Sequence, residues 1–88
     1  MIQKQNFIDK IVNKISEEID IKLSEELENY DGSPMMNIFI DLNPKFLDNE
    51  EIYNAIIAEM NNRNFFVKEI TSSSDRIPKT LISLSLID

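Results

Sequence analysis

A long series of apolar residues at helical spacing constrains the fold of this chain more than any other feature. Its members fall at steps of three or four residues, with Val12 beside them: Ile8, Ile11, Ile15, Ile19, Leu23, Leu27 and Tyr30. This periodicity predicts an amphipathic helix over about residues 6–30, roughly 36 Å long. Pro34 prevents its continuation. Gly32, the only glycine, is expected to provide a left-handed C-terminal cap.

A short alternating stretch leaves a second interpretation of this segment open. Residues 19–23 alternate between apolar and charged side chains, as a strand does, so a break near residues 16–20 is the alternative. Leu23 and Leu27 continue the same apolar stripe, which favours an uninterrupted helix. In such a helix Ile21 points away from the stripe and is exposed on the acidic side.

The rest of the chain predicts an α+β fold made of a single small domain, residues 1–88. Alternating residues and helical spacing give the order α-β-α-β-β, a three-stranded sheet with a long N-terminal amphipathic helix and a second helix packed on it. The last two strands are expected to form an antiparallel hairpin, with the third strand either between the other two or at an edge. The predicted strands cover about residues 35–42, 65–71 and 79–87, and the second predicted helix covers about residues 48–62.

The composition excludes most catalytic and cofactor chemistry. The chain has no cysteine and no histidine, so thiolate nucleophiles, Ser-His-Asp triads and Cys or His metal sites are impossible. One glycine cannot build a phosphate-binding loop. The many carboxylates are neighbours on exposed helix faces, whereas glycosidase chemistry needs two acids facing each other across a cleft. We expect a protein that is not an enzyme and holds no cofactor or metal.

The charge balance limits the partners. A net charge of −7 with no basic patch argues against direct binding to nucleic acid or to anionic membranes. No apolar segment approaches the roughly 20 residues of a membrane-spanning helix. The first residues lack the apolar core of a signal peptide. We expect a soluble, cytoplasmic protein.

The first candidate binding surface is an acidic stretch in the C-terminal half of the first predicted helix. Between residues 17 and 31 seven positions are acidic, and only Lys22 is basic. Acids near a helix C-terminus cost a few tenths of a kcal/mol each, because that end already carries partial negative charge. A solvated face is one interpretation and a docking surface for a basic protein partner is the other. The stretch consists of Glu17, Glu18, Asp20, Glu25, Glu26, Glu28 and Asp31.

The second candidate surface is the sheet face away from the helices. If both helices pack on the face that carries Ile38, Val67 and Ile82, several large apolar side chains remain uncovered on the other. Monomers rarely leave a contiguous apolar patch of that size, so we expect a homo-oligomer or burial in a larger assembly. The predicted interface residues are Phe39, Phe66, Ile70, Leu81 and Ile87.

These surfaces predict a non-catalytic protein-interaction module. Abundant Ile, Asn and Lys with few Ala, Gly and Arg are typical of AT-rich genomes, including phages of low-GC bacteria. A phage or mobile-element accessory protein that inhibits a basic, nucleic-acid-binding host factor through its acidic helix is the preferred function. The alternative is a structural component of an assembly, such as a virion or tail, that packs through the second sheet face and strand edges.

Overall fold

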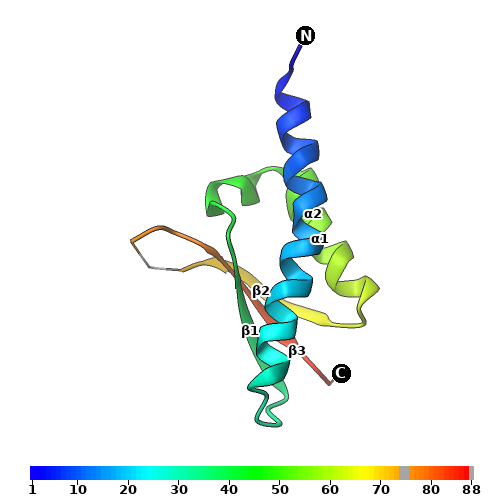
Figure 1. The fold of residues 1–88 in the computed structure, drawn as a ribbon, viewed down its shortest axis with the longest axis vertical. Coiled ribbons are helices and arrows are strands. Elements are labelled where there is room, and N and C mark those ends of the chain that lie inside the picture. The colour runs from blue at the N-terminus through cyan, green and yellow to red at the C-terminus, as the bar shows by residue number, and fades with distance from the viewer. Residues whose placement is uncertain (74–75, 88) are drawn as a thin grey trace.

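The computed structural model describes residues 1–73 and 76–87 and confirms the α+β order. A long helix is followed by a strand, a 3₁₀ turn, a second helix and two strands (Figure 1). The predicted and observed bounds of α1, α2 and the three strands differ by at most two residues. The elements are α1 (Lys4–Glu28), β1 (Met35–Ile40), η1 (Pro44–Asp48), α2 (Glu50–Asn62), β2 (Phe66–Ser72) and β3 (Thr80–Ser85).

The last strand lies in the middle of the sheet. The order is β1-β3-β2, and β3 pairs antiparallel with both neighbours. The predicted antiparallel pairing of the last two strands is confirmed, with residues 74 and 75 of their connection outside the described residues. Strands β1 and β2 therefore run parallel to each other and form the two edges of the sheet.

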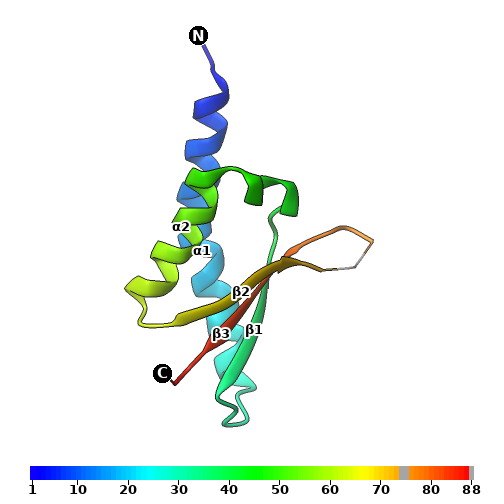
Figure 2. The same cartoon turned by 180° about the vertical axis from the view of Figure 1, so that it is seen from behind.

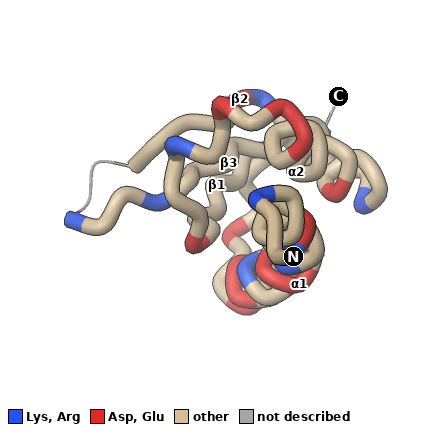
Figure 3. The backbone as a smooth tube through the Cα atoms, turned by 90° about the horizontal axis from the view of Figure 1, so that it is seen from above, with Lys and Arg blue, Asp and Glu red and all other residues tan. Residues whose placement is uncertain are grey.

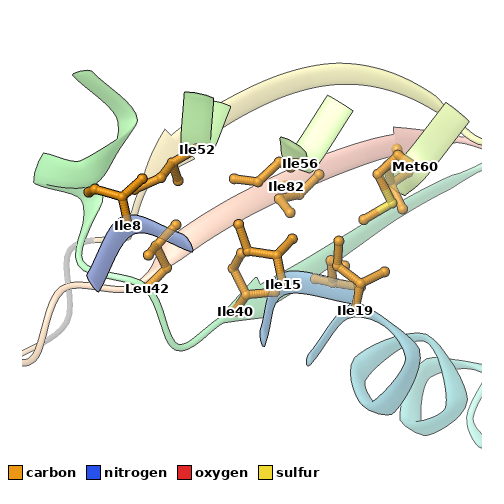
Figure 4. Close-up of a cluster of buried hydrophobic side chains, with 11 residues drawn as sticks. Ile8, Ile15, Ile19, Ile40, Leu42, Ile52, Ile56, Met60 and Ile82 are labelled. Carbon is orange, nitrogen blue, oxygen red and sulfur yellow. The ribbon is translucent and has the colours of Figure 1, made fainter. Parts of the chain in front are cut away.

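Both helices pack on one face of the sheet and bury a small aliphatic core. Helix α1 covers the side of β1, and α2 covers the side of β2, as the view down α1 shows (Figure 3). Side chains from both helices meet those of β1 and β3 in one layer (Figure 4). The core residues are Ile8, Ile15, Ile19, Ile38, Ile40, Leu42, Ile52, Ile56, Met60, Ile82 and Leu84. Within residues 1–73 and 76–87, no helix lies over the opposite face of the sheet (Figure 2).

Helix α1 is continuous through the alternating stretch, so the predicted break is absent from this helix. Ile19 is fully buried and Ile21 is about half exposed, as the helical periodicity predicts. The predicted role of Gly32 is wrong. The helix ends at Glu28 and is followed by the C-cap residue Asn29 with φ −112°, and Gly32 takes its positive φ of 90° three residues after Asn29, in the turn that leads to β1. Any other residue at Gly32 would be strained there.

The N-terminus of α2 lies two residues later than predicted. Asp48 ends η1, and Asn49 caps α2 by accepting a hydrogen bond from the Ile52 N–H at 3.1 Å. An asparagine side chain at this position satisfies one of the free N–H groups of the first turn. At the other end, Asn64 adopts φ 64°, as expected for an asparagine that follows a helix.

One predicted face assignment is wrong, because β2 contains a bulge. Val67 pairs with Leu84 and Glu69 pairs with Ser83, so Lys68 is the extra residue. Ile70 then pairs with Ile82 and packs against the core instead of lying on the outer face. Strict alternation would have placed the Glu69 carboxylate on the core face beside Val67. The bulge turns this charge outward and turns Ile70 inward.

Candidate functional site

The seven acids of the predicted stretch lie on different sides of α1. Glu17 and Glu28 are exposed on the solvent side, and Ile21 lies between them. Glu18 reaches β1, where its Oε1 accepts a hydrogen bond from the Asp41 N–H at 3.1 Å. Asp20 lies on the opposite side and contacts α2. Asp31 lies beyond the helix, in the turn, where its Oδ1 accepts from the Ser33 N–H at 2.9 Å.

Most of these acids lack a compensating charge. Asp20 pairs with Arg63 at 2.8 Å, and Glu25 pairs with Lys22 at 3.7 Å. Among the described residues the other five form no ion pair. The C-terminal half of α1 therefore has a surplus of negative charge that the described residues do not neutralise. The charge is concentrated on the solvent side of α1 and on its β1 side.

Among the described residues Arg63 is the one basic side chain that joins the two helices, and sequence analysis missed it. Its Nε donates to Asp20 Oδ1 at 2.8 Å, and its Nη1 donates to the Glu59 carbonyl at 2.7 Å and to Glu59 Oε2 at 2.8 Å. Its Nη2 donates to Ser16 Oγ at 3.0 Å. The sequence signal that could have indicated it is Glu59, which precedes Arg63 by four residues and so lies on the same helix face, where the two side chains can pair.

Hydrogen bonds from this guanidinium change the ionisation of its partners. They lower the pKa of the Asp20 carboxyl and of the Glu59 carboxyl below their usual values, and burial partly opposes both shifts. The pKa of Arg63 is raised in return, first by Asp20 and then by Glu59. The cluster is only partly buried, and it links α1 to α2 without forming a reactive pocket.

Acid is expected to weaken the fold through this cluster. Because the pKa values of Asp20 and Glu59 are lower in the folded protein, their stabilising contribution is present above the unfolded values near about 4 and is lost as pH falls through the folded values. Urea unfolding between about pH 6 and pH 2 checks this. The free energy of unfolding should exceed that of the Asp20→Asn/Glu59→Gln double variant at the upper pH, and this difference should shrink towards the lower pH. A constant difference across the range would contradict the expectation.

An apolar groove lies beside the C-terminal end of α1, at a position that α2 does not reach. Its volume is about 390 Å³, and its walls come from the end of α1, the start of β1 and the segments that flank β2 and β3. Leu27 is 72% exposed there. The sequence did not predict this groove, because Leu23 and Leu27 continue a stripe that is buried elsewhere along the helix. The lining residues are Asp20, Leu23, Ser24, Leu27, Tyr30, Met36, Phe65 and Leu86.

The outer sheet face does not carry one continuous apolar patch. The register places its side chains in three rows across the strands, and the middle row is polar. Phe39 and Leu81 are cross-strand neighbours at one end, whereas Phe66 lies at the other end. Ile87 is exposed beyond β3. The rows are Phe39–Leu81–Thr71, Asn37–Ser83–Glu69 and Met35–Ser85–Phe66.

Neither a metal cluster nor a membrane-spanning helix is found in the part of the chain that the structure describes. Within residues 1–73 and 76–87, no three carboxylates gather closely enough to hold an ion. No described helix combines the length and the apolarity needed to cross a bilayer.

The chain matches no protein-family model, no curated protein and no solved structure. Its function is therefore inferred from the surfaces of the molecule itself.

Proposed function

We propose that the protein is a non-catalytic interaction module that binds a basic protein partner through the C-terminal half of α1. The supporting observation is the uncompensated charge: five of the seven acids between residues 17 and 31 form no ion pair among the described residues. Two of them, Glu26 and Glu28, lie in the last turn of α1 and oppose the helix dipole, so helix stability does not account for those two. A complementary positive surface would accelerate association and make it sensitive to salt.

The spacing of the acids suits a partner that normally binds nucleic acid. Glu17 and Glu28 are eleven positions apart on the exposed side of α1, which corresponds to roughly 16 Å along the helix. Glu18 and Glu25 add charge on the neighbouring side. An extended row of carboxylates can take the place of a row of phosphates in a basic groove, so inhibition of such a partner is the function we favour.

Neutralising three of these acids is expected to weaken partner binding about tenfold or more, since each lost charge removes a favourable long-range interaction. The test variant is Glu25→Gln/Glu26→Gln/Glu28→Gln. The matched control, Asp48→Asn/Glu50→Gln/Glu69→Gln, changes the net charge equally at positions away from the acidic stretch. Partner captured from extracts of the source cells at about 50 mM salt, and released at about 500 mM, provides the ligand for titration calorimetry.

The two variants separate a local charge effect from unfolding. Removing acids from the C-terminal end of α1 should slightly stabilise the helix, so weaker binding by the test variant cannot be attributed to loss of fold. Equal affinities of wild type, test variant and control would refute a role for the acidic stretch in binding.

The alternative, packing in an assembly through the outer sheet face, has weaker support. Phe39 is 45% exposed and Phe66 is 56% exposed, which favours some contact. The polar row containing Asn37 and Glu69 separates them, and Ile70 contributes to the core instead. The remaining apolar area is therefore divided into two small groups.

A further inference from the structure

The two edges of the sheet differ in how well they are protected against pairing with another strand. Strand β2 carries the bulge at Lys68 and charged side chains at Lys68 and Glu69, and α2 packs beside it. Bulges and charges are the usual means of blocking an edge. Strand β1, with the sequence Met-Met-Asn-Ile-Phe-Ile, has no charge, no proline and no bulge. It is the unprotected edge.

The pairing shows which backbone groups of β1 remain free. The Leu86 N–H donates to the Pro34 carbonyl at 2.8 Å, so the register makes 36, 38 and 40 the residues that bond to β3. The N–H and C=O groups of Asn37 and Phe39 therefore point away from the sheet. The ends of the edge are occupied: the Met35 N–H donates to Ser33 Oγ at 3.3 Å, and the N–H of residue 41 donates to α1.

The acidic side of α1 overhangs this open edge. At one end of β1, the Glu18 carboxylate accepts the hydrogen bond from the Asp41 N–H. At the other end, Glu26 lines a small polar hollow together with Met35 and Asn37. Lys22 is the only basic residue of this part of α1, and it is already paired with Glu25.

We infer that β1 binds an extended basic segment of the partner by strand addition, an inference that rests on the proposed function and names its mode. The incoming strand would hydrogen-bond to the free groups of Asn37 and Phe39. Its side chains on the helix side would meet Glu18, Glu25 and Glu26. Those on the other side would lie beside the exposed ring of Phe39.

The geometry specifies the pattern of the bound segment. Glu18 and Glu26 are eight residues apart on α1, about 12 Å along the axis. Side chains four residues apart on a strand are separated by about 13 Å. A segment with Lys or Arg at alternate positions therefore places one positive charge near each end of the overhang. The intervening positions are apolar, to match the outer face.

A second copy of this chain fits the edge poorly. Antiparallel pairing of β1 with β1 of another molecule would place the two α1 helices side by side on the same face of the joined sheet. Glu18 of each copy would then lie close to Glu26 of the other, with Glu25 nearby. Like charges at that distance oppose association, whereas a basic strand is attracted.

The test uses the full chain and a defined probe, an end-capped eight-residue peptide with Lys and Val alternating. Amide exchange and ¹H–¹⁵N spectra are recorded with and without the peptide. Slower exchange of the Asn37 and Phe39 amides is expected. Asn37→Pro removes one outward N–H while leaving the β1–β3 ladder intact, and should weaken binding about tenfold or more. Asn37→Ala, which retains the N–H, should bind within about twofold of wild type.

A peptide in which the N–H groups of alternate residues are methylated keeps the charge but cannot pair through that edge. We expect this methylated peptide not to bind. The measurement tests backbone pairing with β1 even if the proline variant does not fold. Three results would overturn the inference. The first is equal binding by the methylated peptide, and the second is spectral perturbation of Leu23 and Leu27 in the groove instead of β1. The third is protection of the Asn37 amide that increases with protein concentration when no peptide is present. If the captured partner still requires Glu25, Glu26 and Glu28, the proposed function stands without strand addition.

Discussion

Replacing Ile56 with alanine is expected to lower the free energy of unfolding by about 3 kcal/mol, one of the largest effects available in this molecule. Ile56 is fully buried on α2, in the layer between both helices and the sheet (Figure 4). Truncation removes its burial and leaves a cavity that neighbours on three elements cannot easily fill. Because small domains are stabilised by only a few kcal/mol, the variant should be close to unfolding. The shift of the urea midpoint measures the effect.

The neighbouring isoleucine provides the control. Ile57 is on the same helix but is only partly buried and lies outside the core cluster. Ile57→Ala makes the same chemical change with the same effect on helix propensity, and it should cost about 1 kcal/mol or less. Similar losses for the two variants would show that the core does not lie where the packing places it.

Replacing Arg63 with methionine is expected to cost about 2 kcal/mol, because several charge-assisted hydrogen bonds disappear together and the partly buried Glu59 carboxylate loses its partner. Methionine preserves much of the apolar stem. The bonds in question tie Ser16 and Asp20 of α1 to the end of α2. Urea unfolding near neutral pH measures the loss. The variant should also lose most of the acid sensitivity attributed to Asp20 and Glu59.

An exposed arginine serves as the matched control for this change. Arg76 makes no ion pair among the described residues, and Arg76→Met should alter the free energy of unfolding by less than about 0.5 kcal/mol. If Arg63→Met were equally mild, the contacts between Arg63 and α1 would be surface pairs of negligible value.

The order and type of both α-helices and the three strands could be predicted, because each has a strong period of its own, whereas the 3₁₀ helix η1 was expected only as a connection. The stripe from Ile8 to Leu23 gave α1, and the alternation through Ile38 and Ile40 gave β1. Both periods report burial of one face, which depends on local spacing alone. The ends of helices and strands were harder to place, because neighbouring polar residues can each serve as the cap. Asn49 in place of Asp48 at the start of α2 is one example.

The candidate site was less predictable, since it depends on contacts between distant segments. The acids of α1 are visible in the sequence, but their distribution around the helix relative to β1 and α2 is not. Arg63 neutralises Asp20 from 43 positions away. The bulge at Lys68 moved Ile70 to the other face and divided the predicted apolar patch. The free edge of β1 emerged only when the strand order was known.

The central position of β3 also has a consequence for biosynthesis. Among the described residues β3 is the only strand that pairs with β1 or with β2, so neither has a partner strand until β3 has been translated. Sheet assembly must wait until residues 80–85 have left the exit tunnel. Until then the nascent chain carries two strand segments without a partner, of which β1 is uncharged, and chaperones that recognise apolar extended segments can bind it during that interval.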